Sequence, residues 1–151
     1  MPEEVVEGFQ LSTQQKRLWL AQSGGDGAAF VSQCALAAEG ALDVRALRKA
    51  FASLVSDYEI LRTSFHSLVG MDVPVQVIAD DAEPPDFGAL DLSGRSDEEV
   101  EREIERVADE ERRRPFDFKR APLLHCALIK LADERHLLVI TQPAMCADAG
   151  S

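Results

Sequence analysis

Two apolar runs near the end of the chain constrain the fold most. Residues 123–131 and 136–141 are separated by the short polar segment 132–135, which predicts a hairpin or two neighbouring strands. The core of the second run, residues 137–140, is apolar without alternation. Because strands of that kind are buried on both faces, we expect it to lie in the centre of a sheet.

Three helices are predicted from the residues that cap them. Ser12 with Gln15 and Ser96 with Glu99 have the spacing of a capping box, and Asp43 can cap a helix between them. That middle helix carries an apolar stripe, made of Leu47, Phe51, Leu54, Val55 and Tyr58. The stripe recurs at helical spacing, so we expect one face of this helix to be buried.

The remaining segments mix short strands and loops. Residues 30–37, 60–67 and 73–78 read as strands, and residues 80–94, with two prolines, two glycines and several acids, read as a loop. The order of helices and strands shows no regular βαβ alternation. It therefore predicts an α+β domain, with a mixed β-sheet packed against helices.

Composition and charge exclude several classes of partner. The 151 residues are 46% hydrophobic, enough for a real core, and the net charge is −11, which repels nucleic acid and anionic lipid. Residues 1–9 hold no apolar run that would mark a signal peptide, and no apolar stretch is long enough to span a bilayer. We therefore expect a cytoplasmic protein that binds neither nucleic acid nor membrane.

The cysteines and histidines show no metal-site spacing. The chain has three of each, namely Cys34, Cys126, Cys146, His66, His125 and His136. Cys146 has no histidine nearby in sequence to activate it as a nucleophile, so a small buried role is expected. Cys34 and Cys126 are predicted to be core residues of strands, and none of the histidines is assigned to catalysis or to a metal.

Four segments carry a family resemblance. Residues 11–19 (LSTQQKRLW) resemble the motif SxAQxRLW, and residues 57–65 (DYEILRTSF) resemble RHExLRTxF with Asp-Tyr in place of Arg-His. Residues 114–124 (RPFDFKRAPLL) resemble RPFDLxxxPLLR, and residues 137–141 stand where a strand leads into the motif HHxxxDG. In this order and spacing the segments resemble the condensation domains of nonribosomal peptide synthetases over nearly the whole chain.

The resemblance implies a fold and a set of partners. Condensation domains have two lobes that each resemble chloramphenicol acetyltransferase, with the active-site motif between them, where the phosphopantetheine arms of two carrier proteins meet. Residues 1–10 would then be a lead-in and residues 11–151 the N-terminal lobe, without its C-terminal lobe. Implied partners are a peptidyl or aminoacyl carrier protein, the missing lobe and a trans-acting hydroxylase, and no directly bound cofactor is expected. An isolated lobe would also expose an apolar interface and could self-associate.

The active-site motif departs from the family pattern. With Asp148 aligned to the motif aspartate, the two histidine positions are Pro143 and Ala144, and the glycine position is Ala149. Alanine offers no ionisable proton and no lone pair, so amide condensation is not expected. The heterocyclization branch has DxxxxDxxS instead, and Pro143, Asp148 and Ser151 supply only its last two residues.

Two functions stay open at this point. The first is a catalytically degenerate condensation-like domain that acts as a docking or interface module for carrier proteins or a tailoring enzyme. The second is a heterocyclization-like or altered condensation enzyme that acts on carrier-bound aminoacyl or peptidyl thioesters. A free-standing acyltransferase is disfavoured, since that chemistry also needs a base. In either case the resemblance implies that Asp148 forms a structural ion pair with Arg62.

Overall fold

The computed structural model describes residues 7–25 and 30–147. Its main sheet has four strands in the order β1 (Val31–Glu39), β6 (Arg135–Pro143), β5 (His125–Ala132) and β4 (Asp86–Asp91). β6 runs antiparallel to both of its neighbours, whereas β4 runs parallel to β5. The predicted hairpin of the two apolar runs and the central position of the second run are therefore confirmed.

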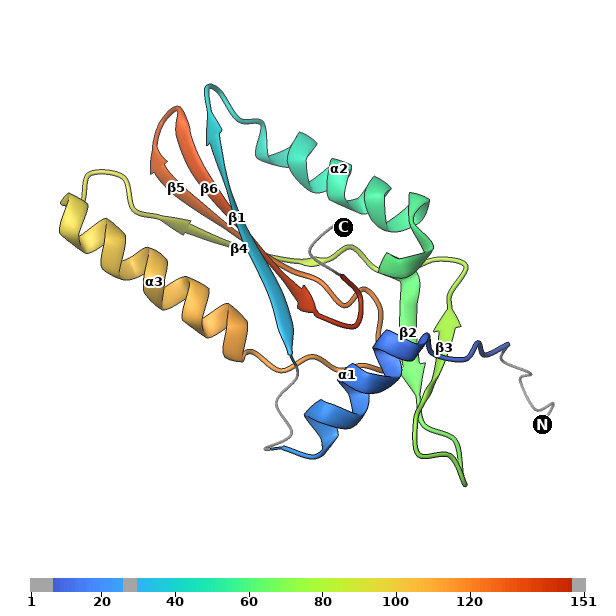
Figure 1. Cartoon of the computed structure of the whole chain (residues 1–151). Helices are drawn as coiled ribbons and strands as arrows, with labels where there is room; N and C mark the ends of the chain where they lie inside the picture. The colour runs from blue at the N-terminus through green and yellow to red at the C-terminus, as the bar shows by residue number, and fades with distance from the viewer. Residues whose placement is uncertain (1–6, 26–29, 148–151) are drawn as a thin grey trace.

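Alternate residues of β5 and β6 face opposite layers, as strand geometry requires. On one face, Ile129 and Val139 are buried against α3 (Asp97–Arg113). On the other face, Leu128 and Leu138 are buried against the apolar side of α2 (Val44–Asp57). Figure 1 shows the two helices on opposite sides of the sheet, which accounts for the lack of alternation in residues 137–140.

All three predicted helix caps are present. Ser12 and Ser96 form complete capping boxes at the starts of α1 (Thr13–Ser23) and α3. The Asp43 side chain accepts hydrogen bonds from two backbone N–H groups at the start of α2. The polar side chains thus satisfy N–H donors that have no partner within the helix.

The apolar stripe of α2 is only partly buried. Phe51 and Leu47 pack against the sheet and Val55 is fully buried, as predicted. Leu54 and Tyr58, however, are 40% and 57% exposed, because the last turn of α2 extends past the sheet toward the neighbouring hairpin (Figure 1). The prediction was wrong for these two residues.

A small hairpin and α1 form a second unit at one end of the sheet. β2 (Thr63–His66) pairs antiparallel with β3 (Val75–Ile78), and the turn of 3₁₀ helix η1 (Glu59–Arg62) precedes it. The predicted strand over residues 60–67 is therefore shorter than expected, since its first three residues belong to η1. Leu11 beside α1, Phe65 of β2 and residues near the ends of β5 and β6 share one hydrophobic cluster.

Two other sequence predictions were wrong. Residues 86–91 form β4 inside the segment expected to be a loop. The strand is stabilised by hydrogen bonds to β5, and a local sequence pattern does not predict such pairing. Cys34 is exposed, since β1 is the edge strand of the sheet, whereas Cys126 is buried as predicted. No helix within residues 7–25 or 30–147 is long and apolar enough to cross a membrane.

Candidate functional site

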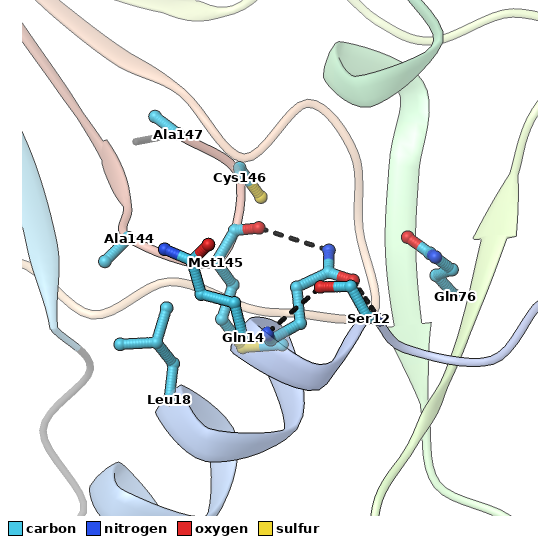
Figure 2. A pocket seen from close by; sticks show the side chains of 9 residues that line it. Ser12, Gln14, Leu18, Gln76, Ala144, Met145, Cys146 and Ala147 are labelled. Carbon is cyan, nitrogen blue, oxygen red and sulfur yellow. Dashed lines mark hydrogen bonds between the residues drawn. The ribbon is translucent and has the colours of Figure 1, made fainter. Parts of the chain in front are cut away.

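A pocket of about 280 Å³ lies where the chain leaves β6 and meets the first turns of α1. We call residues 144–147 the motif loop, because they follow the strand that leads into the aligned active-site motif. The pocket lining combines this loop with residues of α1 and β3, namely Ser12, Gln14, Gln15, Leu18, Gln76, Ala144, Met145, Cys146 and Ala147. Figure 2 shows the loop facing the start of α1.

Gln15 joins the helix cap to the motif loop. Its Oε1 accepts a hydrogen bond from the Ser12 N–H at 2.9 Å, and its own N–H donates to Ser12 Oγ at 3.2 Å. Its Nε2 donates to the carbonyl oxygen of Met145 at 3.2 Å (Figure 2). One side chain therefore completes the capping box and holds the loop, a second function that its spacing from Ser12 did not indicate.

Gln22 and the backbone of Phe30 also hold the motif loop in place. The buried Gln22 side chain accepts a hydrogen bond from the Phe30 N–H at 3.3 Å and points its Nε2 at Met145 Sδ, 3.8 Å away. The Ala144 N–H donates to the Phe30 carbonyl oxygen at 2.7 Å. Met145 is also buried in a hydrophobic cluster against which Leu18 and Trp19 of α1 pack, so apolar contacts hold the loop beside the pocket as well.

The aligned active-site positions differ in their surroundings. Pro143 is fully buried at the end of β6, and Ala144 is half-buried and lines the pocket. Asp148, Ala149 and Ser151 lie outside the described residues. The position aligned with the second histidine therefore opens onto a pocket, but its methyl group cannot move a proton.

Cys146 is the one ionisable side chain in the pocket lining given above. Burial raises the pKa of its thiol to about 12, so the thiolate that a nucleophile requires is scarce near neutral pH. This agrees with the prediction of a small buried role. The rest of the lining offers amides, a hydroxyl and backbone groups, which can bind a polar ligand but do not supply a general base.

The histidines lie away from the pocket lining. His66 contacts Ser64 Oγ at 2.9 Å, and His136 is buried in β6. His125 stacks on the Phe116 ring with centroids 4.1 Å apart, and its Nδ1 lies 3.8 Å from Glu111 Oε2. In residues 7–25 and 30–147, no group of three or more His, Cys, Asp or Glu side chains could hold a metal ion.

Arg62 is engaged with backbone carbonyl groups. Its Nε donates to the Val55 oxygen at 3.2 Å, and Nη1 donates to the oxygens of Ala79 and, at 3.4 Å, Asp80. These bonds tie η1 to the end of α2 and to the segment after β3. The predicted ion pair with Asp148 stays a prediction, because Asp148 lies outside the described residues.

The sequence reasoning missed three glutamines of this site. Gln14 and Gln76 line the pocket, and Gln22 supports it. A signal existed only for Gln14, which stands at the alanine position of SxAQxRLW. Gln22 and Gln76 carry no spacing signal, since their roles depend on segments that are distant in sequence.

Comparison with known proteins adds a family and several relatives. The model of the family described as "Condensation domain" matches residues 6–151. The chain is 39% identical to part of tyrocidine synthase 3 of Brevibacillus parabrevis, over 92% of this chain and 2% of that protein. It is 35% identical to part of chondramide synthase cmdD of Chondromyces crocatus, over 93% of this chain and 4% of that protein.

Solved structures with the same fold include three kinds of related domain. The first condensation domain of the calcium-dependent antibiotic synthetase, in complex with a substrate analogue, matches 91% of this chain and 33% of its own, with a TM-score of 0.77 at 27% identity. The EpoB cyclization-docking bidomain of Sorangium cellulosum matches 96% of this chain and 28% of its own, with a TM-score of 0.73 at 26% identity.

The third is the X-domain in its complex with OxyB from teicoplanin biosynthesis. It matches 91% of this chain and 28% of its own, with a TM-score of 0.72 at 25% identity. The chain thus spans about a third of the condensation-domain structure, and a few per cent of the two synthases.

Proposed function

This chain belongs to the condensation-domain family of nonribosomal peptide synthetases, and from that premise we propose that it is a catalytically degenerate member. Residues 11–151 would be the N-terminal lobe of a domain that docks partners instead of forming amide bonds. Its partners would be a carrier protein, whose phosphopantetheine arm enters the pocket, and a tailoring enzyme such as a hydroxylase.

One observation carries the proposal. Ala144 stands at the aligned position of the second histidine and lines the pocket, where the side chains of the described lining residues offer hydrogen bonds but no general base. An amine acceptor would reach the thioester there without a group to take or position its proton. Binding is retained in such a site, and amide formation is lost.

Two of the structural relatives illustrate the docking function. One is an X-domain solved in complex with OxyB, and the other is a cyclization-docking bidomain. A fold shared with both is compatible with a domain that serves as a platform for another protein. The relation to the cyclization bidomain also supports the second candidate, a heterocyclization-like enzyme that uses Asp148 and groups of its second lobe.

The test uses the full synthetase module that contains this chain. Donor and acceptor carrier proteins are loaded, the module is added, and condensed or cyclised product is followed by intact-protein mass spectrometry. A condensation domain with both motif histidines is the positive control, and Asp148→Ala is the matched variant. Carrier binding is measured in parallel by surface plasmon resonance.

We expect carrier binding without product, for both the natural module and Asp148→Ala. Product that disappears in Asp148→Ala would overturn the degenerate-domain proposal and favour the cyclization-like enzyme. Absence of both product and carrier binding would overturn the docking role.

A further inference from the structure

Gln14 differs from the other polar residues of the pocket. It lies in the first turn of α1, is solvent exposed and lines the pocket together with Ala144. Figure 2 shows its carboxamide on the side of the pocket where Ala144 and Met145 lie. The Gln15 carboxamide, in contrast, donates to the Met145 carbonyl oxygen. Neighbouring glutamines of one helix turn thus have separate orientations.

Each of the other polar side chains of the lining already makes a hydrogen bond within the protein. Gln15 is bound at both ends of its carboxamide, and Ser12 Oγ accepts the Gln15 N–H. Gln76 Nε2 donates to the carbonyl oxygen of Gln10 at 3.0 Å. Within the described parts of the chain, the Gln14 side chain makes no hydrogen bond, so its donor and its acceptor remain available to a ligand.

Two departures from the family pattern meet in this pocket. Gln14 occupies the alanine position of SxAQxRLW, and Ala144 occupies the second histidine position of HHxxxDG. Relative to the family motifs, the motif loop has an alanine in place of a histidine, and the first turn of α1 has a glutamine in place of an alanine. A carboxamide is neutral, so it cannot replace the histidine as a base, but it can donate and accept a hydrogen bond at once.

We infer that Gln14 is a specificity-determining residue that hydrogen-bonds a secondary amide of the ligand in this pocket. A secondary amide has one N–H and one C=O, and a carboxamide complements both. The amide can come from the pantetheine arm of a carrier protein or from the acyl chain attached to that arm. This inference rests on the proposed function and names the group that the docking site recognises.

The experiment measures carrier affinity with the full module and three forms of the carrier protein. These are the apo form, the form with a bare phosphopantetheine arm, and the form whose arm carries an N-acetyl-aminoacyl group through a non-hydrolysable thioether. Gln14→Ala removes both hydrogen-bonding groups, and Gln14→Glu keeps the size and the acceptor but loses the donor. Thr13→Ala, an exposed neighbour on α1 outside the pocket lining, is the matched control.

We expect Gln14→Ala to weaken binding of an arm-bearing carrier about three- to tenfold, the loss typical of one or two ligand hydrogen bonds. Affinity for the apo carrier stays unchanged in every variant, and Thr13→Ala binds all forms like the natural module. A loss with the bare arm identifies the pantetheine amides as the recognised group. A loss confined to the acylated arm identifies the amide of the attached chain.

Equal affinity of Gln14→Ala and the natural module for all three carrier forms would overturn the inference while leaving the docking proposal intact. If the natural module binds no carrier form, the docking proposal itself is wrong. We expect Gln14→Ala to fold like the natural module, since Gln14 is exposed and alanine favours helix. An unchanged melting temperature of Gln14→Ala checks this point.

Discussion

Single residues of this chain have effects that their neighbours in sequence do not predict, and Arg62 is the clearest case. It belongs to η1, yet its guanidinium binds carbonyl oxygens of α2 and of the segment after β3. Charge-assisted hydrogen bonds to backbone groups hold these segments together where no regular ladder joins them. The motif resemblance implies Asp148 as a further partner, and this pairing stays a prediction.

Replacing Arg62 with alanine is predicted to lower the free energy of unfolding of the domain by about 2–4 kcal/mol, because half-buried carbonyl groups lose a charged donor. Urea unfolding of the full domain measures the loss. The predicted ion pair requires that Asp148→Asn also destabilises the domain and that the double variant loses less than the sum of the two single losses. Additive losses would exclude the pair, and an unchanged stability of Arg62→Ala would refute both roles.

His125 is predicted to make the domain less stable in mild acid. Burial lowers the pKa of its imidazole to about 4, and the nearby Arg114 adds to this effect while Asp86 opposes it. Between the unfolded pKa of about 6.5 and pH 4 the unfolded state binds the extra proton, so stability falls as the pH falls through this window. Between pH 7 and pH 5, protonation of His125 in the unfolded state is expected to lower the free energy of unfolding by about 1–2 kcal/mol.

Unfolding in urea at pH 7 and pH 5 tests this contribution. His125→Gln should lose less stability than the natural domain between the two values. Burial raises the pKa of Glu111, which contacts His125, and protonation of this carboxyl in the folded state partly offsets the loss. Glu111→Gln should therefore show a larger loss, and identical losses in the natural domain and His125→Gln would contradict the argument.

Helices are the elements that the local sequence specifies best in this protein. α1, α2 and α3 each begin at the predicted cap residue, because capping depends on side chains only two or three positions away. Strands β1, β2 and β3 were predicted with shifted ends, and β4 was missed. A strand is stabilised by its partner strand, which the local sequence does not contain.

Ser96→Ala is predicted to lower the free energy of unfolding by about 1 kcal/mol, the usual value of an N-cap. The substitution removes the acceptor of the Glu99 N–H. Only the other hydrogen bond of the capping box, from the backbone N–H of position 96 to the Glu99 side chain, remains. Ser53→Ala, at an exposed position within α2, is the matched control and should change stability by less than about 0.5 kcal/mol. Equal effects of the two substitutions in urea unfolding would show that the cap is not stabilising, and Ser96→Asp should restore most of the loss.

For the whole molecule, the sheet order and the pocket depend on contacts between distant segments. β1 pairs with β6 about a hundred positions away and forms the edge of the sheet, so Cys34 is exposed and Leu36 is 53% exposed. An exposed apolar edge is the kind of surface on which a second copy can pair. The expected self-association of an isolated lobe stays a prediction.

The helix starts, the central apolar strand, the α+β class and the ordered motifs of the condensation family could all be predicted from the amino-acid sequence. Each of these depends on neighbouring residues or on a pattern read along the chain. That Gln14 and Ala144 share a pocket, and that Gln15 and Gln22 hold the motif loop, became visible in the folded chain alone. A hydrogen bond such as that between Gln15 and Met145, 130 positions apart, depends on how α1 packs against the end of the sheet, and no local sequence pattern encodes that packing.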